Sequence, residues 1–508
     1  MKLKNIKHSK LITILILVFL FVNCHAQENA LKFETIKGPY QTNGASPWYT
    51  LMSIGTPSQE NFKTIFDTGG NFAWITSTQC LTEACTQKTP LERIRFDMSK
   101  SSSFSWNEDC TASKKSWGPW GDMYINRGSD NINFLVNSET KKVPVKQQKF
   151  IQSIYYEGEK FIEMNWDAGF GFPSSSKLSD IDTPSLLENL LNQGQIKPDS
   201  NQNLLVSFYS NPVTKEGHVL IGTDFDQDLV DLSSALVLPF QPYIKSSGIE
   251  YLWTTPLKSW SVGEKIVAQP NDNLFCLDSG SSRFKGDSAQ LSTSLKLIDD
   301  YYTKFGKYPS LNFNIGDDDT KMISITPDLY RVKVDEGIDK GKTVTAITTS
   351  LNIDDLILVG SVVMDNVYTV YRYKVTHVSS GKFSYTPLGM VLYNKKDGPK
   401  IIQDIALEEE MRTPAKIEIY PNPSNNGVFN IRVHLTKQLK SIYARVYDSN
   451  GREISLSDNE LNNSGSLHSG WHNLQVKVND KSNLNRFFIK VFDENDNVLT
   501  QKQIILNE

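Results

Sequence analysis

Short apolar runs, separated by polar and turn-forming residues, follow one another along most of the chain. From about Tyr49 to Lys395 these runs have strand length and are divided by Gly, Pro and Asn, which predicts many short β-strands. The chain also contains 25 Phe, 20 Tyr and 9 Trp, and aromatic side chains favour strands. Helical spacing of apolar residues is found at Ser185–Gln193 and at roughly Ser288–Phe305. We therefore expect a mostly β protein with few helices.

The pattern changes after the strand-rich region. Gln403 to Lys416 is charged, contains proline and lacks strand alternation, which indicates a linker that we place at 396–416. Residues 417–508 then return to short alternating segments and form a separate module. With 508 residues the chain is too long for one compact core, so several domains are expected.

Strand and turn signals in the C-terminal module predict a small β-sandwich. Asn450-Gly451 is a two-residue hairpin signal between expected strands at Ala444–Tyr447 and Glu453–Ile454. Phe487–Phe492 has the pattern of a buried strand. Asp493–Asn497 lacks the glycine and the later acidic ligand of a calcium loop and indicates a plain turn.

The first 26 residues have the pattern of a secretory signal peptide. Four lysines precede the apolar run Leu11–Val22, which is too short for a comfortable membrane span, and Ala26 offers a small residue for cleavage. A second interpretation makes Cys24 a lipidated cysteine. Residues 27–48 are expected to be a short polar lead-in. Export is therefore the expected fate of the chain.

Charge and motif content exclude several function classes. Without the signal segment the chain has 49 basic and 57 acidic residues, a net charge of −8, and no basic tract that would indicate nucleic-acid binding. The seven His form no metal-ligand pair such as H-E-x-x-H, and no Gly-rich phosphate loop is present. Gly286-Asp287-Ser288 lacks the partners of a serine-protease loop and indicates a helix N-cap. We expect no metal and no cofactor.

Four cysteines remain after the signal segment, and an even number in an exported chain indicates disulfides. Cys80 and Cys85 would close a short loop and are the first candidates for a pair. Cys110 with Cys276 then follows by elimination.

One tetrapeptide pattern occurs twice, each time directly after an apolar strand. Asp67-Thr68-Gly69-Gly70 and Asp278-Ser279-Gly280-Ser281 share the order Asp, hydroxyl residue, Gly, small residue, and the two Asp are 211 residues apart. One copy alone is best explained as a tight turn with an Asp cap. Two copies, each directly after an apolar strand, are much less probable by chance than one copy.

The repeat continues downstream of each aspartate. Trp166–Phe172 follows the first Asp loop and Leu356–Gly360 follows the second, each an apolar segment with glycine. Such an internal repeat predicts two similar lobes whose Asp loops meet at a pseudo-two-fold axis. The glycines would allow the two loops to approach closely.

With these motifs in place, residues 49–392 resemble the pepsin-like aspartic proteases. The resemblance implies a bilobal pepsin-like fold of two pseudo-symmetric antiparallel β lobes, about 49–225 and 226–395 within a domain at 49–395. Five further landmarks match the family pattern: Ile54-Gly55-Thr56-Pro57, Trp74 seven residues after Asp67, the short loop of Cys80 and Cys85, Thr183–Leu187, and Val219–Asp224.

The resemblance implies that Asp67 and Asp278 are the catalytic pair. Two carboxyls a few ångströms apart share one proton, so that one acts as general base toward water and the other donates to the scissile carbonyl. The family pattern further implies that Thr68 and Ser279 brace the two loops across the axis and that Ser281 hydrogen-bonds Asp278. Gly69 and Gly280 complete the supporting loops.

Three features depart from the family pattern. Gly70 stands where Ser or Thr is usual, so Asp67 loses a donor, which is expected to raise the lower pKa of the pair and narrow the acidic working range. In Trp117–Gly121, Trp117 takes the place of the flap tyrosine; the alternative is an exposed hairpin with aromatic residues. The usual basic prosegment is missing, so activation by removing a long prosegment is not expected.

Ile65, Trp74 and Trp117 would line an apolar pocket beside the two aspartates, with core packing as the alternative for Ile65 and Trp74. The expected function is a secreted aspartic endopeptidase with an acidic pH optimum that cuts polypeptides beside hydrophobic residues. The alternative is a non-catalytic binding or inhibitor protein on the same scaffold, and a surface adhesin is a third possibility. We expect a monomer, because one chain supplies both Asp loops.

The C-terminal module resembles the sorting domain of type IX secretion cargo. The residues that carry this resemblance are Ile419–Pro423, Gly427–Ile431, Val446–Ile454 and Phe487–Val491. It implies that 417–508 engages the type IX secretion machinery and that the protein becomes extracellular, either released or held at the outer-membrane surface. The alternative is an accessory β-sandwich that binds substrate.

Overall fold

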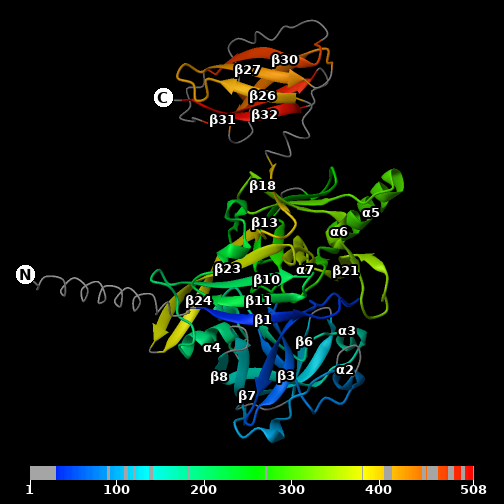
Figure 1. The fold of residues 1–508 in the computed structure, drawn as a ribbon, viewed down its shortest axis with the longest axis vertical. Helices are drawn as coiled ribbons and strands as arrows, with labels where there is room; N and C mark the ends of the chain where they lie inside the picture. The colour runs from blue at the N-terminus through cyan, green and yellow to red at the C-terminus, as the bar shows by residue number, and fades with distance from the viewer. Residues whose placement is uncertain are drawn as a thin grey trace, which may run out of the picture. The chain divides into compact units, whose positions relative to one another are not determined.

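A computed structural model describes the chain in fourteen segments (Figure 1): 30–87, 92–107, 112–117, 120–136, 141–180, 182–268, 272–379, 381–405, 415–435, 438–448, 453–454, 467–478, 486–493 and 498–506. The chain divides into two compact units, Met1–Ile402 and Gln403–Glu508, and each is considered by itself. None of the helices within the described segments has the length and apolar character needed to cross a membrane. The signal segment and Cys24 lie outside the described residues.

Strands from both halves of the chain join in one large sheet of the first unit. Figure 1 shows β1, β11, β10 and β23 side by side in the middle of this unit. Among the described residues the sheet has 14 strands, in the order β12 (Leu236–Leu238), β24 (Lys382–Asn394), β23 (Val367–Ser379), β10 (Asn203–Asn211), β11 (Glu216–Gly222), β1 (Leu31–Lys37), β2 (Trp48–Ile54), β3 (Gln59–Asp67), β9 (Ala168–Gly171), β4 (Ala73–Thr76), β8 (Lys141–Tyr155), β7 (Asp122–Val136) and β5 (Ser105–Trp106), with β6 (Ser113–Ser116) beside β7.

A second sheet carries the other lobe. Within the described residues it has nine strands, in the order β21 (Ile347–Asn352), β16 (Phe284–Gly286), β22 (Leu356–Val359), β15 (Leu274–Leu277), β13 (Thr254–Val262), β17 (Leu311–Ile315), β18 (Lys321–Ile325) and β25 (Ile402–Asp404), with β14 (Lys265–Ala268) beside β13. The small pair β19 (Arg331–Lys333) and β20 (Thr343–Thr345) is separate. The helices are α2 (Glu83–Thr86), α3 (Glu159–Ile162), α4 (Leu186–Asn192), α5 (Ser288–Phe305), α6 (Pro327–Tyr330) and α7 (Ser361–Met364).

The same arrangement of strands occurs in both lobes, which confirms the predicted internal repeat. In the first lobe β3 runs parallel to β9, and β9 is antiparallel to β4. In the second lobe β15 runs parallel to β22, and β22 is antiparallel to β16. Glycine is required where each inner strand ends, because a Cβ at Gly171 would lie 2.6 Å from the Gly70 carbonyl oxygen and one at Gly360 would collide with the Ser281 backbone. Both lobes therefore hold an Asp loop against an inner strand.

Both predicted helices are present. The helix predicted at Ser185–Gln193 is α4, which begins one residue later and is capped by the Ser185 hydroxyl accepting from the Glu188 N–H. The second is α5 with the predicted bounds, and its N-cap is Asp287, whose carboxylate accepts from the backbone of Ala289 and Gln290. The capping interpretation of Asp287 is therefore confirmed.

The lead-in at 27–48 is not merely polar. Residues 31–37 form β1, which pairs antiparallel with β11 in the large sheet. Leu31 and Phe33 alternate with exposed or half-buried positions and are 3% and 0% exposed. This strand was missed because the segment is short and begins close to the signal segment, although its alternation is visible in the sequence.

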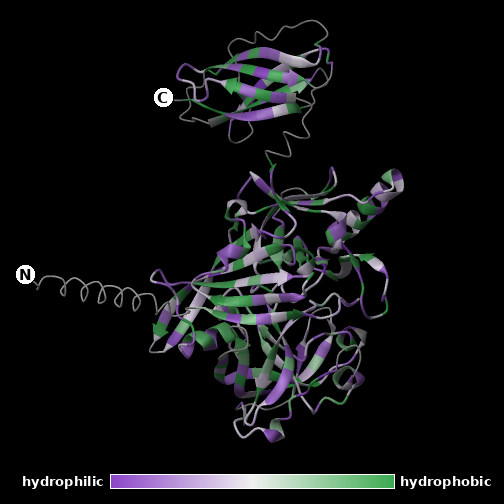
Figure 2. Ribbon diagram, in the orientation of Figure 1, coloured by the Kyte–Doolittle hydropathy of each residue, from purple (hydrophilic) through white to green (hydrophobic). Residues whose placement is uncertain are grey.

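The second unit consists of two sheets that share one apolar core, as expected for a β-sandwich. Its strands are β26 (Ala415–Tyr420), β27 (Val428–Leu435) and β30 (Gly470–Lys477) in one sheet, and β29 (Glu453–Ile454), β28 (Ile442–Asp448), β31 (Arg486–Asp493) and β32 (Val498–Ile505) in the other. Figure 2 shows hydrophobic and hydrophilic residues alternating along these strands. The predicted pairing across Asn450-Gly451 is present as β28 with β29. The turn residues themselves, and 494–497, lie outside the described residues.

Candidate active site

Asp67 and Asp278 meet at a cavity of about 190 Å³ between the two lobes. A Cβ at Gly69 would collide with the Asp278 carboxyl, and a Cβ at Gly280 would collide with the Asp67 carboxyl. Each loop therefore places its glycine directly against the aspartate of the other loop. The two aspartates are called the dyad below.

Reciprocal hydrogen bonds hold the two loops together beneath the dyad. The Thr68 N–H donates to Ser279 Oγ at 2.9 Å, and the Ser279 N–H donates to Thr68 Oγ1 at 3.0 Å. Each hydroxyl then donates to a carbonyl of the opposite lobe, Thr68 to Leu277 at 3.1 Å and Ser279 to Phe66 at 2.6 Å. The two hydroxyl residues thus satisfy buried backbone groups of both loops and fix the loops relative to each other.

The two aspartates differ in their hydrogen bonds. The Gly280 N–H donates to Asp278 Oδ1 at 2.8 Å, and the Ser281 hydroxyl donates to Asp278 Oδ2. Asp67 Oδ1 accepts from the Gly69 N–H at 2.9 Å, but Gly70 has no side chain that could donate to it. Asp278 is 4% exposed, whereas Asp67 is partly exposed to the cavity.

The surroundings of Asp67 favour its protonated form. Burial and the negative charge of Asp278 raise the pKa of Asp67 well above its usual value. The Gly69 N–H and the ammonium of Lys285 act in the opposite direction and lower that pKa. The dyad can therefore hold one shared proton, which is the state that general acid–base chemistry with two carboxyls requires.

Lys285 was not predicted as a site residue. Its Nζ lies 3.4 Å from Asp278 Oδ2, and its side chain is 18% exposed in the cavity wall. It stands seven residues after Asp278, the spacing that separates Trp74 from Asp67, and it occupies β16 as Trp74 occupies β4. Applying the repeat to this spacing would have found it.

Aromatic side chains form the wall of the cavity on the first lobe. The cavity is lined there by Phe72, Trp74, Trp117, Trp120 and Trp166. The ring centroids of Trp74 and Trp117 are 4.5 Å apart in an edge-to-face arrangement. Trp74 can come this close to the inner strand because Gly169 leaves space for its indole nitrogen. This wall suits apolar groups.

The hairpin at 113–125 carries Trp117 over the cavity. Strands β6 and β7 pair from Ser113↔Ile125 to Ser116↔Asp122, and the Trp117 N–H donates to the Gly121 carbonyl at 2.8 Å. Trp117 is half-buried and contacts Phe72 with ring centroids 5.5 Å apart, so it is not an exposed aromatic at a hairpin tip. Residues 118–119 lie outside the described residues.

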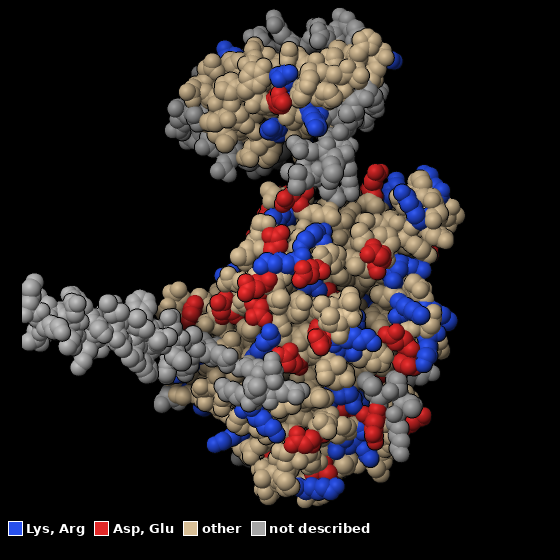
Figure 3. Space-filling model, viewed as in Figure 1, with Lys and Arg blue, Asp and Glu red and all other residues tan. Residues whose placement is uncertain are grey.

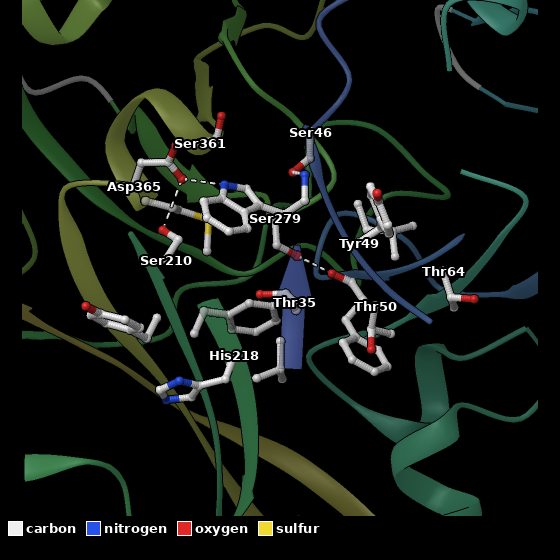
Figure 4. Close-up of a pocket in the computed structure, with 17 residues that line it drawn as sticks. Thr35, Ser46, Tyr49, Thr50, Thr64, Ser210, His218, Ser279, Ser361 and Asp365 are labelled. Carbon is white, nitrogen blue, oxygen red and sulfur yellow. Dashed lines mark hydrogen bonds between the residues drawn. The ribbon is translucent and has the colours of Figure 1, made fainter. Parts of the chain in front are cut away.

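Ile65 does not line the dyad cavity, contrary to expectation. It is 3% exposed and borders a smaller cavity of about 50 Å³ on the other side of the loops (Figure 4). Ser279 reaches this smaller cavity, and Thr50 lies opposite it (Figure 4). Ile65 and Asp67 lie on the same face of β3, but Ile65 is packed in a buried apolar cluster with Trp74 and does not reach the surface of the dyad cavity.

Two tyrosines near the dyad were also missed. The Tyr371 hydroxyl donates to the Leu277 carbonyl at 3.2 Å and lies 3.2 Å from Thr68 Oγ1, directly beneath the braced loops. Burial raises the pKa of Tyr371. Tyr251 lines the dyad cavity, and burial followed by the charges of Asp67 and Asp278 raises its pKa. Neither residue belongs to a local motif, so the sequence carried no signal for them.

Of the cysteines, Cys80 and Cys85 form the predicted disulfide. Cys276 is a free, buried thiol, so the pairing of Cys276 with Cys110 by elimination is wrong. Cys276 lies on β15 among apolar residues, where burial raises its pKa. Cys110 lies outside the described residues.

Charged side chains of both signs are intermingled over the face of the molecule seen in Figure 3. Within the described residues, no group of three or more His, Cys, Asp or Glu side chains is arranged to hold a metal ion.

Comparison with known proteins identifies two matching families. The profile of the family described as eukaryotic aspartyl protease matches residues 47–383, and that of the secretion system C-terminal sorting domain matches residues 418–505. The second match indicates a protein that is secreted, to the medium or to the outer-membrane surface.

Individual relatives come from the same family. Gastricsin of Oryctolagus cuniculus is 31% identical over 214 residues, which cover 40% of this chain and 48% of the relative. Pepsin A of Gallus gallus is 32% identical over 227 residues, covering 44% and 52%. Cathepsin E-B of Xenopus laevis is 23% identical over 305 residues, covering 57% and 68%. The chain thus spans about half the length of the first two relatives. Because the family profile covers most of the chain, from the first Asp loop through the second, the chain belongs to the eukaryotic aspartyl protease family.

Proposed function

We propose that the protein is a secreted aspartic endopeptidase that hydrolyses peptide bonds with a water molecule held between Asp67 and Asp278. The observation that carries the proposal is that two carboxyls, one from each of two loops related by a pseudo-two-fold axis, meet at one cavity. A non-catalytic binding protein on this scaffold would have no need to keep both carboxyls and both bracing hydroxyls.

The proposed reaction needs only the dyad, water and the substrate. The ionised carboxyl takes a proton from water, whose oxygen attacks the scissile carbonyl carbon, while the protonated carboxyl donates to the carbonyl oxygen. The resulting tetrahedral diol collapses when the C–N bond breaks: one diol hydroxyl gives its proton back to the dyad as the new C=O forms, and the leaving nitrogen receives a proton from the dyad. No covalent bond to the protein forms, and the dyad ends with one proton, as it began.

The cavity wall suggests which substrates are cut. Clefts between β lobes bind extended chains as added strands, so unfolded or loop-rich polypeptides are the proposed substrates. The aromatic wall with Trp74 and Trp117 would take an apolar side chain beside the cut bond. In this proposal Trp117 takes the place of the flap tyrosine. It covers the cavity with an apolar ring and offers an indole N–H as hydrogen-bond donor where the tyrosine would offer a phenol hydroxyl.

The pH range follows from the dyad. Activity requires one proton on the pair, so it rises as the first carboxyl ionises and falls as the second does. Asp67 is the carboxyl whose protonated form is favoured, so the donor that Gly70 withholds raises the second of these two pKa values and moves the end of activity to higher pH. An acidic optimum with an alkaline limb extended to higher pH is the expected profile.

The C-terminal module would direct export. We propose that 417–508 engages the type IX secretion machinery, supported by the match of residues 418–505 to a secretion sorting domain. Deleting this module should leave the protein inside the cell envelope, which fractionation and immunoblotting would detect.

Hydrolysis of a denatured protein by the purified full chain, measured from pH 3 to pH 7 with and without pepstatin, tests the proposed activity. We expect cleavage at acid pH, inhibition by pepstatin, and no cleavage by the variants Asp67→Ala and Asp278→Ala. If the folded wild-type protein cleaves nothing at any of these pH values, the binding-protein interpretation replaces this one.

A further inference from the structure

Lys285 places a positive charge in the wall of the dyad cavity, and the proposed reaction has no step that uses this charge. Among the described residues that line the cavity, it carries the single positive charge, and the only negative charges are those of the dyad. Its ammonium lies 3.4 Å from Asp278 Oδ2, longer than the 2.7–2.9 Å that is typical of a charge-assisted hydrogen bond.

The ammonium of Lys285 retains unused hydrogen-bonding capacity. An ammonium has three donors, and within the described part of the chain the ion pair with Asp278 is its one polar partner. Asp278 in turn already accepts from Gly280 and Ser281, so it does not depend on Lys285. At least two donors of Lys285 are therefore available to a ligand in the cavity.

Aliphatic side chains of the second lobe line the same cavity as this ammonium. Lys285 stands opposite Leu358 across the β16–β22 pair, and Leu351, Ile353 and Ile249 line the same side of the cavity. Along β16 the residues Phe284 and Gly286 are buried, whereas Lys285 is half-buried and lines the cavity. A short aliphatic stem ending in a carboxylate would match this combination of apolar wall and cation.

The two walls of the cavity thus differ in chemistry. The first lobe offers several aromatic rings to one side chain of a bound polypeptide, and the second lobe offers mainly aliphatic groups, with Tyr251 and one cation, to another. We propose that Lys285 is a specificity-determining residue, which selects substrates with an acidic side chain, glutamate above all, at one position next to the cut bond. This inference rests on the proposed peptidase function and names the substrate class of the same site.

Matched peptides separate this role from an effect on the dyad. The test compares kcat/KM for peptides that carry Glu or Gln at each of the two positions on either side of the cut bond, at pH 5, where a free Glu side chain is ionised. Any influence of Lys285 on the acidity of the dyad multiplies both rates equally and cancels in the Glu/Gln ratio.

We expect the wild-type full chain to prefer Glu over Gln at one position by about 10- to 100-fold, the range of a hydrogen bond to a charged group. Lys285→Met should abolish this preference, mainly through a higher KM for the Glu peptide, and Lys285→Arg should keep it. Lowering the pH below about 4 should weaken the preference in the wild type, because the substrate carboxyl becomes protonated.

Each result decides a different question. A wild-type enzyme that cleaves Glu and Gln peptides equally at all positions overturns the inference without any variant, even if Lys285→Met fails to fold. A ratio in Lys285→Met that equals the wild-type ratio overturns it as well. Absence of cleavage of every peptide by the wild type instead contradicts the proposed peptidase function.

Discussion

The substitution Gly70→Ser restores to Asp67 the kind of donor that Asp278 already has. In the second loop the hydroxyl of Ser281 donates to Asp278 Oδ2, and Gly70 occupies the equivalent place in the first loop. The backbone at Gly70 does not adopt a positive φ, so a side chain can be introduced without backbone strain. A hydroxyl at this position would stabilise the ionised form of Asp67.

The expected size of the effect follows from the contact geometry. A hydrogen bond to a charged group contributes about 1.5–3 kcal/mol, which corresponds to a pKa change of about 1–2 units. A Cβ at Gly70 would lie 2.8 Å from Asp67 Oδ2, so the carboxyl must move slightly and part of this gain is lost. Because Asp67 is the carboxyl whose protonated form is favoured, we therefore expect the alkaline limb of the kcat/KM profile to move to lower pH by about one unit.

The assay is the pH dependence of kcat/KM on one peptide from pH 2 to pH 7. Gly70→Ala is the matched control, because it adds the same Cβ without the hydroxyl. We expect the alkaline limb of Gly70→Ala to stay at the wild-type position or to move to higher pH. If both variants move the limb equally, or if Gly70→Ser moves it to higher pH, the reasoning about the missing donor is refuted.

Three further results are expected. Lys285→Met removes the cation that lowers the pKa of Asp67, so both limbs of the pH profile should move to higher pH by about one unit, whereas Lys285→Arg should keep the wild-type limbs. Asp67 has a folded-state pKa above its unfolded value, so its ionisation destabilises the fold increasingly as the pH rises above about 4; Asp67→Asn should raise Tm more at pH 7 than at pH 3. Thr68→Val leaves the Ser279 N–H without its acceptor and should lower the free energy of unfolding in urea by about 1–3 kcal/mol, with a smaller loss when Ser279→Ala is already present.

Much of the fold could be predicted because its signals are local. The alternation of apolar residues marked the strands, and helical spacing with a capping residue marked α4 and α5. The repeated Asp motif predicted two lobes with loops that face each other, and the strand pairings of β3 with β9 and β15 with β22 have this form. The strand β1 escaped prediction because its segment is short and begins close to the signal segment; its partner β11 lies almost 200 residues away along the chain.

The composition of the cavity wall could not be predicted in the same way. Trp74 and Trp117 were anticipated from their spacing to the first Asp loop, but Ile65 was assigned to the cavity although its side chain points into the lobe. Tyr251 reaches the site from the second lobe through loop geometry that depends on the packed structure, whereas the seven-residue spacing from Asp278 carried a signal for Lys285 that was not used. Residue spacing therefore located the dyad and part of the cavity wall, but not all of it.

The central claim is that both carboxyls of the dyad take part in peptide hydrolysis. Its most direct test is the rate of hydrolysis of a denatured protein at pH 4 by the wild type, Asp67→Asn and Asp278→Asn, with folding of each variant checked by thermal unfolding. The account predicts that either substitution, in a folded protein, lowers the rate by at least about 10²- to 10⁴-fold, since each carboxyl supplies general acid or base catalysis. A folded variant that retains a rate within tenfold of the wild type would contradict the account.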